Sequence, residues 1–108
     1  VELLVGQVGL NGQANEMFRI SFDGSIVDEK NLAVIGGRSE AVQQYLREHA
    51  TPQPPTLRDA LRRCLAALEQ VATQKIPSEN LEVAVLDRNR LGRKFKRLTS
   101  ADISQLFA

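Results

Sequence analysis

The sequence contains little of the chemistry on which metal centres and nucleophilic catalysis depend. Its 108 residues include one cysteine, Cys64, one histidine, His49, and no tryptophan. A single cysteine cannot form an internal disulfide, which excludes the disulfide-stapled secreted class. One cysteine and one histidine do not make a zinc site. No apolar run approaches the roughly 20 residues that a membrane span requires, so we expect a soluble chain without membrane contact.

What remains is an ordinary globular composition. Apolar residues make up 43% and charged residues 25% of the chain, which excludes disorder along its whole length. A chain of this size forms one domain at most, so we expect residues 1–108 to be a single domain. The sequence starts at Val1, inside a predicted strand and without a charged-then-apolar leader. We therefore expect a processed, cut or truncated chain.

Clustered and alternating apolar side chains predict five short strands. Phe18, Ile20 and Phe22 share one face of such a strand, as expected when one face is buried. Glycine and polar residues predict a hairpin loop at 9–15 and a turn at Asp23-Gly24. The predicted strands are residues 1–8, 17–22, 31–35, 81–86 and 94–98, with residues 26–30 as a short connection.

A period of three to four residues predicts three helices. The first begins near Ser39 and is ended by the prolines of residues 51–55. The second begins at Thr56, with Asp59 at the spacing of a capping box, and the third is capped by Thr99 or Ser100. The expected apolar stripes are Val42, Tyr45, Leu46 and His49; Leu57, Leu61, Cys64, Leu65, Leu68 and Val71; and Ile103, Leu106 and Phe107. The order β-β-β-α-α-β-β-α segregates strands from helices and predicts an α+β fold.

Several of the predicted strands are apolar on both faces. In residues 1–8, Leu3 and Val5 point one way and Leu4 and Val8 the other, and residues 31–35 and 81–86 behave alike. Such strands are typical of sheets covered on both sides. Three short helices can cover only one face of a five-stranded sheet, and each bare aliphatic side chain would forgo roughly 1.5–3 kcal/mol. The second face is therefore expected to meet something that this chain does not contain.

The sequence offers few candidates for catalysis or ligand binding. We interpret His49 as a partly buried helix-end histidine rather than a catalytic base, and Cys64 as a small hydrophobe rather than a reactive thiol. Residues 36–39 are better explained by a tight strand-to-helix turn than by an anion site. The carboxylates Asp23, Asp28 and Glu29 lack calcium-loop spacing and predict a solvated corner. No catalytic, cofactor-binding or metal-binding residue is assigned.

The strongest charge signal is a basic block near the end of the chain. Residues 1–86 carry eight Lys or Arg against eleven Asp or Glu, whereas residues 87–97 carry six against Asp87 alone. Nucleic-acid binding would favour interleaved aromatic side chains, and only Phe95 is present, which makes that partner the weaker interpretation. A solvated or edge-protecting hairpin, or a protein contact, explains the block better. The candidate protein-contact residues are Arg88, Arg90, Arg93, Lys94 and Lys96.

Four segments, in order along almost the whole chain, are similar to proteasome α-type subunits, especially the actinobacterial ones. Residues 17–28 (MFRISFDGSIVD) resemble a strand and turn of that family, and residues 32–40 (LAVIGGRSE) its following strand and helix start. Residues 56–61 (TLRDAL) and 81–87 (LEVAVLD) resemble its second helix and a late strand. The match covers only the C-terminal half of a family member.

The resemblance implies an N-terminal-nucleophile hydrolase-type αββα sandwich, of which this chain is a part. It further implies a non-catalytic structural subunit, without the catalytic N-terminal threonine, in the α-ring that controls substrate entry into a 20S-type core. The implied partners are other α subunits, β subunits and, through the complete subunit, an ATPase activator ring. A cytoplasmic homo-oligomer without a cofactor is expected. The alternative is a small self-associating binding module that uses residues 88–97 on an anionic or nucleic-acid partner.

Overall fold

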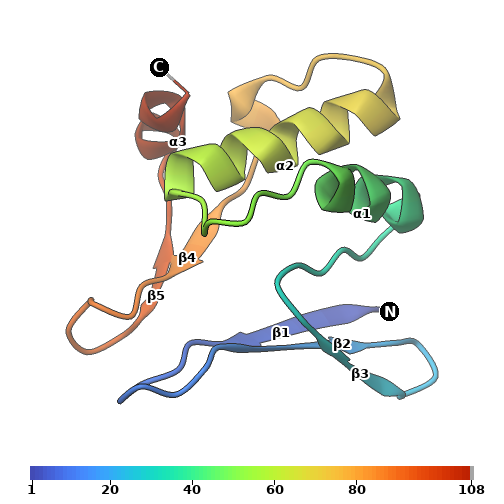
Figure 1. Ribbon diagram of the computed structural model, residues 1–108. Coiled ribbons are helices and arrows are strands. Elements are labelled where there is room, and N and C mark those ends of the chain that lie inside the picture. Colours follow the sequence, from blue (N-terminus) through green and yellow to red (C-terminus); the bar gives the residue numbers. More distant parts are fainter. Residues whose placement is uncertain (108) are drawn as a thin grey trace. The chain divides into compact units, whose positions relative to one another are not determined.

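The computed structural model describes residues 1–107 of the chain (Figure 1). The elements are β1 (Leu3–Gln7), β2 (Glu16–Ile20), β3 (Ile26–Glu29), α1 (Ser39–Glu48), α2 (Leu57–Ala72), the 3-10 turn η1 (Ser78–Asn80), β4 (Ala84–Leu86), β5 (Phe95–Arg97) and α3 (Ser100–Leu106). The predicted α+β class and the predicted order are confirmed. The chain forms two compact units, residues 1–39 with 84–96 and residues 40–83 with 97–108.

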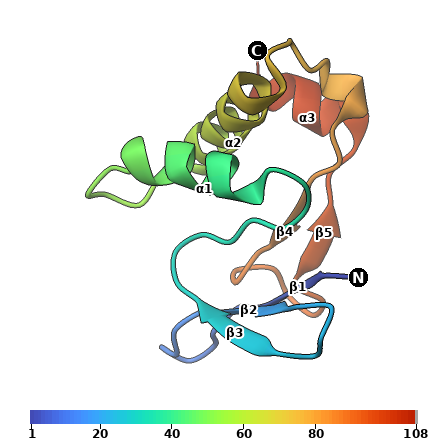
Figure 2. The ribbon, with the colours of Figure 1, turned by 90° about the vertical axis from the view of Figure 1, so that its right-hand side faces the viewer.

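The first unit is built around an antiparallel sheet in the order β1-β2-β3 (Figure 2). Sequence-adjacent strands pair because the predicted turn at Asp23-Gly24 forms: the Ser21 N–H donates to the Ser25 carbonyl at 2.9 Å. Gly24 has a φ of 86°, a conformation that glycine adopts without steric cost. The turn reverses the chain at once and sends β3 back along β2.

The position of the third strand differs from the prediction. Residues 31–35 are not a strand, and the residues expected to be a connection form β3 instead. The tight turn leaves no room for a spacer between β2 and its partner, and Asn31, with a φ of 70°, takes the chain out of the strand conformation. Phe22 is also misplaced by the prediction, because β2 ends at Ile20 and the Phe22 side chain is 84% exposed.

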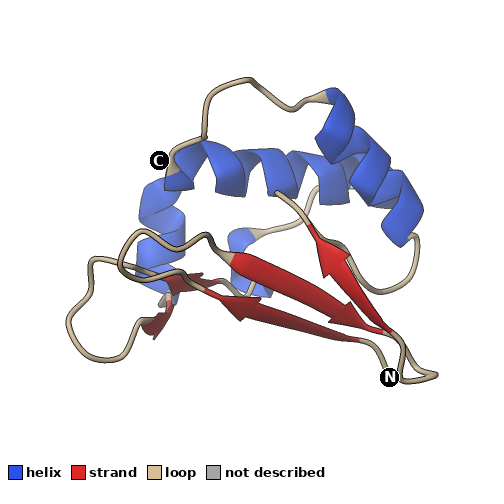
Figure 3. Cartoon of the chain, turned by 60° about the horizontal axis from the view of Figure 1, so that its bottom comes forward, coloured by secondary structure: helices blue, strands red, loops and turns tan. Residues whose placement is uncertain are grey.

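The two faces of this sheet differ in chemistry. The register pairs Val5 with Phe18 and Ile20 with Ile26, whereas Arg19 lies opposite Leu4 and Val27. We name the two sides the Phe18 face (Leu3, Val5, Phe18, Ile20 and Ile26) and the Arg19 face (Leu4, Gly6, Met17, Arg19 and Val27). Figure 3 shows the three strands of the sheet at the front of the view. On the Phe18 face, Leu3 is 51% and Ile26 67% exposed, which leaves much apolar surface in water.

The late strands do not join this sheet. β4 and β5 form a two-stranded sheet of their own, so the single five-stranded sheet assumed from the sequence is wrong. Each strand pairs with a neighbour in the sequence, and no hydrogen-bonded ladder joins the two sheets within residues 1–107. A Cβ placed on Gly6 would lie 3.7 Å from Leu86 Cδ1, which puts β4 against the Arg19 face.

The second unit is helical, and capping bonds define where its helices begin. The Thr56 hydroxyl accepts the Asp59 N–H at 3.1 Å, which starts α2 at the predicted place. At α3, Thr99 Oγ1 accepts the Asp102 N–H at 3.1 Å and the Thr99 N–H donates to Asp102 Oδ2 at 3.0 Å, a complete capping box. Both helix starts therefore follow from local side-chain chemistry.

The buried apolar side chains all lie in the second unit. Each helix contributes: Val42 and Leu46 from α1, Ala67 from α2 and Ile103 from α3. The predicted stripe of α2 is wrong in detail, because Leu57 is 46% and Leu68 41% exposed. The small Ala67 is fully buried instead, which indicates close approach at that face of the helix. Within residues 1–107, no helix has the length and apolarity needed to cross a membrane.

Candidate functional site

The basic block forms the loop of the β4–β5 hairpin, coloured orange in Figure 1. The loop is closed by the Asp87 N–H, which donates to the Lys94 carbonyl at 2.9 Å. Asp87 Oδ1 also accepts the Asn89 N–H at 2.9 Å, an Asx turn that reverses the chain after β4. Gly92, with a φ of 71°, supplies the left-handed residue on the return. A hairpin was one of the predicted explanations of the block, and the structure confirms it.

Several of the cationic side chains fold back on the loop. Arg90 Nη1 donates to the Phe95 carbonyl at 2.7 Å, and Lys94 Nζ donates to the Arg90 carbonyl. The Arg93 guanidinium lies over the Phe95 ring, 5.3 Å from its centroid. These contacts join opposite sides of the loop, so the hairpin tip is ordered by its own side chains.

Asn15 connects this hairpin to the β1–β2 loop. Its side-chain oxygen accepts both the Gly9 N–H, at 2.9 Å, and Arg88 Nη2. Gly9 has no space for a side chain, because an added Cβ would lie 2.0 Å from the Gln13 carbonyl oxygen. The base of the basic hairpin is thus fixed to a tightly folded neighbouring loop.

The positive charge of the hairpin is not neutralised by the residues around it. Arg19 forms ion pairs with Glu2 and Glu29, whereas no cation of the hairpin has an acidic partner within residues 1–107. The one acidic residue of the block, Asp87, is engaged by the Asn89 backbone. At the tip, Leu91 is 94% exposed between Arg90 and Gly92. The hairpin therefore presents an exposed aliphatic side chain within a basic loop.

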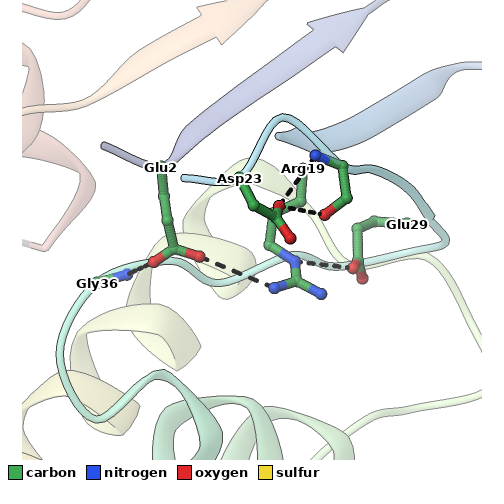
Figure 4. Close-up of polar contacts among 6 residues, drawn as sticks. Glu2, Arg19, Asp23, Glu29 and Gly36 are labelled. Carbon is green, nitrogen blue, oxygen red and sulfur yellow. Dashed lines mark hydrogen bonds and ion pairs between the residues drawn. The ribbon is translucent and has the colours of Figure 1, made fainter. Parts of the chain in front are cut away.

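A second polar cluster lies on the Arg19 face (Figure 4). Arg19 Nε donates to Glu29 Oε1 at 3.3 Å, and Arg19 Nη1 lies 3.8 Å from Glu2 Oε2. The other oxygen of Glu2 accepts the Gly36 N–H at 3.4 Å. One arginine on the central strand thus links the start of β1, the end of β3 and the segment before α1. Its contacts are structural, since every group in the cluster is already paired.

The predicted acidic corner is only partly solvated. Asp23 and Asp28 are exposed, but the Glu29 side chain is 14% exposed and paired with Arg19. The Asp23 carboxylate accepts the Ser25 N–H at 3.0 Å and the Ser25 hydroxyl at 2.7 Å, and these two bonds lower the pKa of Asp23. The Arg19 cluster was not predicted from the sequence. The one indication was that Arg19 lies on the face of residues 17–22 opposite the apolar one.

Within residues 1–107, the turn before α1, the one histidine and the one cysteine of the sequence do not form a common site. Gly36 and Arg38 both have positive φ, 104° and 61°, so a turn leads into α1, but no strand precedes it directly, because residues 31–35 are not a strand. His49 is exposed, not partly buried, because α1 ends at Glu48; its ring stacks on Tyr45 at 3.9 Å and its Nδ1 lies 2.9 Å from the Tyr45 carbonyl. Cys64 is also exposed, yet partial burial raises the pKa of its thiol and disfavours the reactive thiolate.

No arrangement typical of a metal or catalytic centre is found in the part of the chain that the structure describes. Residues 1–107 contain no group of three His, Cys, Asp or Glu side chains placed to hold a metal ion. A hollow of about 370 Å³ is lined by the proline-rich segment 51–55 with Asp59 and Arg63. It offers one carboxylate and one guanidinium but no nucleophile with a base beside it.

Known proteins resemble this chain over nearly its whole length. The family model described as "Proteasome subunit" matches residues 1–86. The protein named proteasome subunit alpha from Streptosporangium roseum is 42% identical over 108 residues, and the match covers 100% of this chain and 41% of that protein. The proteins of the same name from Thermomonospora curvata and Frankia alni are 41% and 37% identical; each match covers 100% of this chain, and 47% and 48% of those proteins.

The predicted resemblance is therefore confirmed. The chain spans less than half the length of the curated relatives it matches. The family match includes the three-stranded sheet and both long helices, and it ends at Leu86, the last residue of β4. The chain belongs to the proteasome subunit family.

Proposed function

We propose that this chain is the C-terminal portion of an α-type subunit of a 20S-type proteasome core. The observation that carries the proposal is the 42% identity over the whole chain to a protein named proteasome subunit alpha. In this role the protein is a structural and assembly component. It acts by compartmentalisation, because a ring of such subunits restricts access to a chamber whose nucleophiles lie on other chains.

The exposed Phe18 face supports the view that this chain is part of a larger folded unit. Leu3, Val5 and Ile26 are 51%, 44% and 67% exposed. Covering such side chains contributes about 1.5–3 kcal/mol each when they pass from fully exposed to fully buried, although the gain is smaller for surface that is already partly covered. The remainder of the complete subunit is the proposed cover for this face.

A non-catalytic role agrees with the chemistry of the described residues. Nδ1 of His49, just after α1, lies 2.9 Å from the Tyr45 carbonyl, and burial raises the pKa of the Cys64 thiol. Neither residue has the environment of an activated nucleophile or its base. The proposed partners are other α subunits, β subunits and an ATPase ring, and the proposed location is the cytoplasm.

The alternative of a small module that binds nucleic acid has no support from the relatives, which are named as proteasome subunits. The hairpin itself is poorly suited to stacking bases, since the Arg93 guanidinium already lies over the ring of Phe95.

The proposal is tested by peptidase activity in a reconstituted system. The full-length protein is purified alone and after coexpression with the β-type subunit of the same organism. We expect no peptide hydrolysis by the protein alone, and hydrolysis by the coexpressed material that disappears when the β nucleophile is replaced. Hydrolysis by the protein alone would overturn the non-catalytic assignment.

A further inference from the structure

The tip of the basic hairpin combines properties of a protein-docking element. Leu91 is 94% exposed, more than any large apolar side chain of the described strands and helices although Val1 is 95% exposed, and it lies in the loop between Arg90 and Gly92. A leucine exposed to this degree contributes nothing to the fold of its own unit. Seated in a recess of a partner, it would remove a large apolar area from water.

The charges around Leu91 define what kind of surface that partner must present. Arg93 stacks on Phe95, and the side chain of Lys96 has no hydrogen bond or ion pair within residues 1–107, so the donor groups of these two cations are not used inside the loop. Cations without a counter-ion favour an acidic surface and disfavour a basic or purely apolar one.

The hairpin is also ordered before it meets a partner. The bonds from Arg90 to the Phe95 carbonyl and from Lys94 to the Arg90 carbonyl join the two sides of the loop. Arg88 fixes its base through Asn15. A loop held in this way loses little conformational freedom on binding, which favours association.

We propose that the hairpin tip, Leu91 with Arg93 and Lys96, docks on a neighbouring subunit of the assembled particle. The contact surface of that neighbour carries carboxylates around an aliphatic recess. Protein is favoured over nucleic acid because the aromatic face in the loop is occupied by Arg93, and because Leu91 offers bases neither a hydrogen bond nor a stacking surface. The inference rests on the proposed function for the identity of the neighbour.

The first test measures whether Leu91 becomes covered. The Leu91→Cys variant of the full-length subunit is treated with N-ethylmaleimide, free and after assembly with the β-type subunit, and the modified residue is located by peptide mass spectrometry. We expect labelling to be at least tenfold slower in the particle. Equal rates would overturn the docking inference while the particle itself still upheld the proposed function. If the wild-type subunit forms no particle, both fail.

The second test addresses the charge of the partner. We expect the Arg93→Glu/Lys96→Glu variant to lower the yield of particle at least tenfold. The matched control, Lys30→Glu/Lys75→Glu, makes the same change of charge at exposed positions outside the hairpin and is expected to leave the yield unchanged. Equal yields for both variants would contradict an acidic partner. Binding of a 20-nucleotide oligothymidylate by the wild-type subunit, lost in the hairpin variant, would contradict the choice of protein over nucleic acid.

Discussion

Replacing Ile26 with alanine in the full-length subunit tests whether the Phe18 face is covered in the complete protein. In this chain the Ile26 side chain is 67% exposed, so only about a third of it is removed from water. If the face stays bare, the substitution removes little buried surface and costs less than about 1 kcal/mol. If the rest of the subunit covers the face, Ile26 becomes a core residue, and truncation to alanine costs about 2–5 kcal/mol.

Urea unfolding of the wild-type and variant subunits gives the difference in the free energy of unfolding. We expect a loss of at least about 2 kcal/mol with an unchanged slope. Gln13→Ala, in the exposed loop between β1 and β2, is the control and should change stability by less than about 0.5 kcal/mol. A loss below about 1 kcal/mol for Ile26→Ala would refute the reasoning, since it would mean that the face remains in water.

Three further predictions concern single interactions. Arg19→Met leaves the largely buried Glu29 carboxylate without its partner, so it should destabilise the subunit by about 1–2 kcal/mol in urea unfolding; no loss would show that the pair contributes nothing. Thr99→Ala removes the cap of α3 and should cost about 1 kcal/mol, whereas Thr99→Ser should restore most of it; equal losses would exclude the hydroxyl as the cause. The lowered pKa of Asp23 means that its contribution to stability is complete above the ordinary aspartate value and disappears as the pH falls through the folded pKa. An NMR titration of the Asp23 carboxyl should have a midpoint below the ordinary value, mainly because of the Ser25 N–H, and should move upward in Ser25→Ala; a midpoint indifferent to that substitution would exclude a contribution of the Ser25 hydroxyl.

Local chemistry made the helix starts predictable from the sequence. Thr56 and Thr99 both cap helices with their own hydroxyl groups, so the few residues around them contain the necessary information. The turn at Asp23-Gly24 was predictable for the same reason. The basic block could be interpreted as a hairpin because it lies between two predicted strands and because lysines at a strand edge discourage strand addition, although its partner could not be identified from charge alone.

The third strand could not be placed because pairing, not composition, decided it. Residues 31–35 are more apolar than Ile26–Glu29, yet the tight turn at Ser21–Ser25 brings the latter beside β2. The Arg19 cluster depends on the same register, which sets Arg19 near Glu29 across the sheet. Such contacts come from tertiary arrangement, which local propensity does not encode.

The buried stripe of α2 was wrong for a related reason. The periodicity of the sequence identified an apolar face of the helix that includes Leu57 and Leu68. It does not indicate which face of the helix other parts of the chain will cover. Ala67 of α2 is fully buried instead. We propose that the rest of the complete subunit or its neighbours contact these leucines, because this chain spans less than half the length of its relatives.

The proposed assembly is tested most directly by the native mass of the full-length protein coexpressed with its β-type subunit. We expect one large particle that contains many copies of both chains in a fixed ratio. Recovery of the protein as a stable monomer, with no β chain bound under any salt condition that preserves folding, would contradict it.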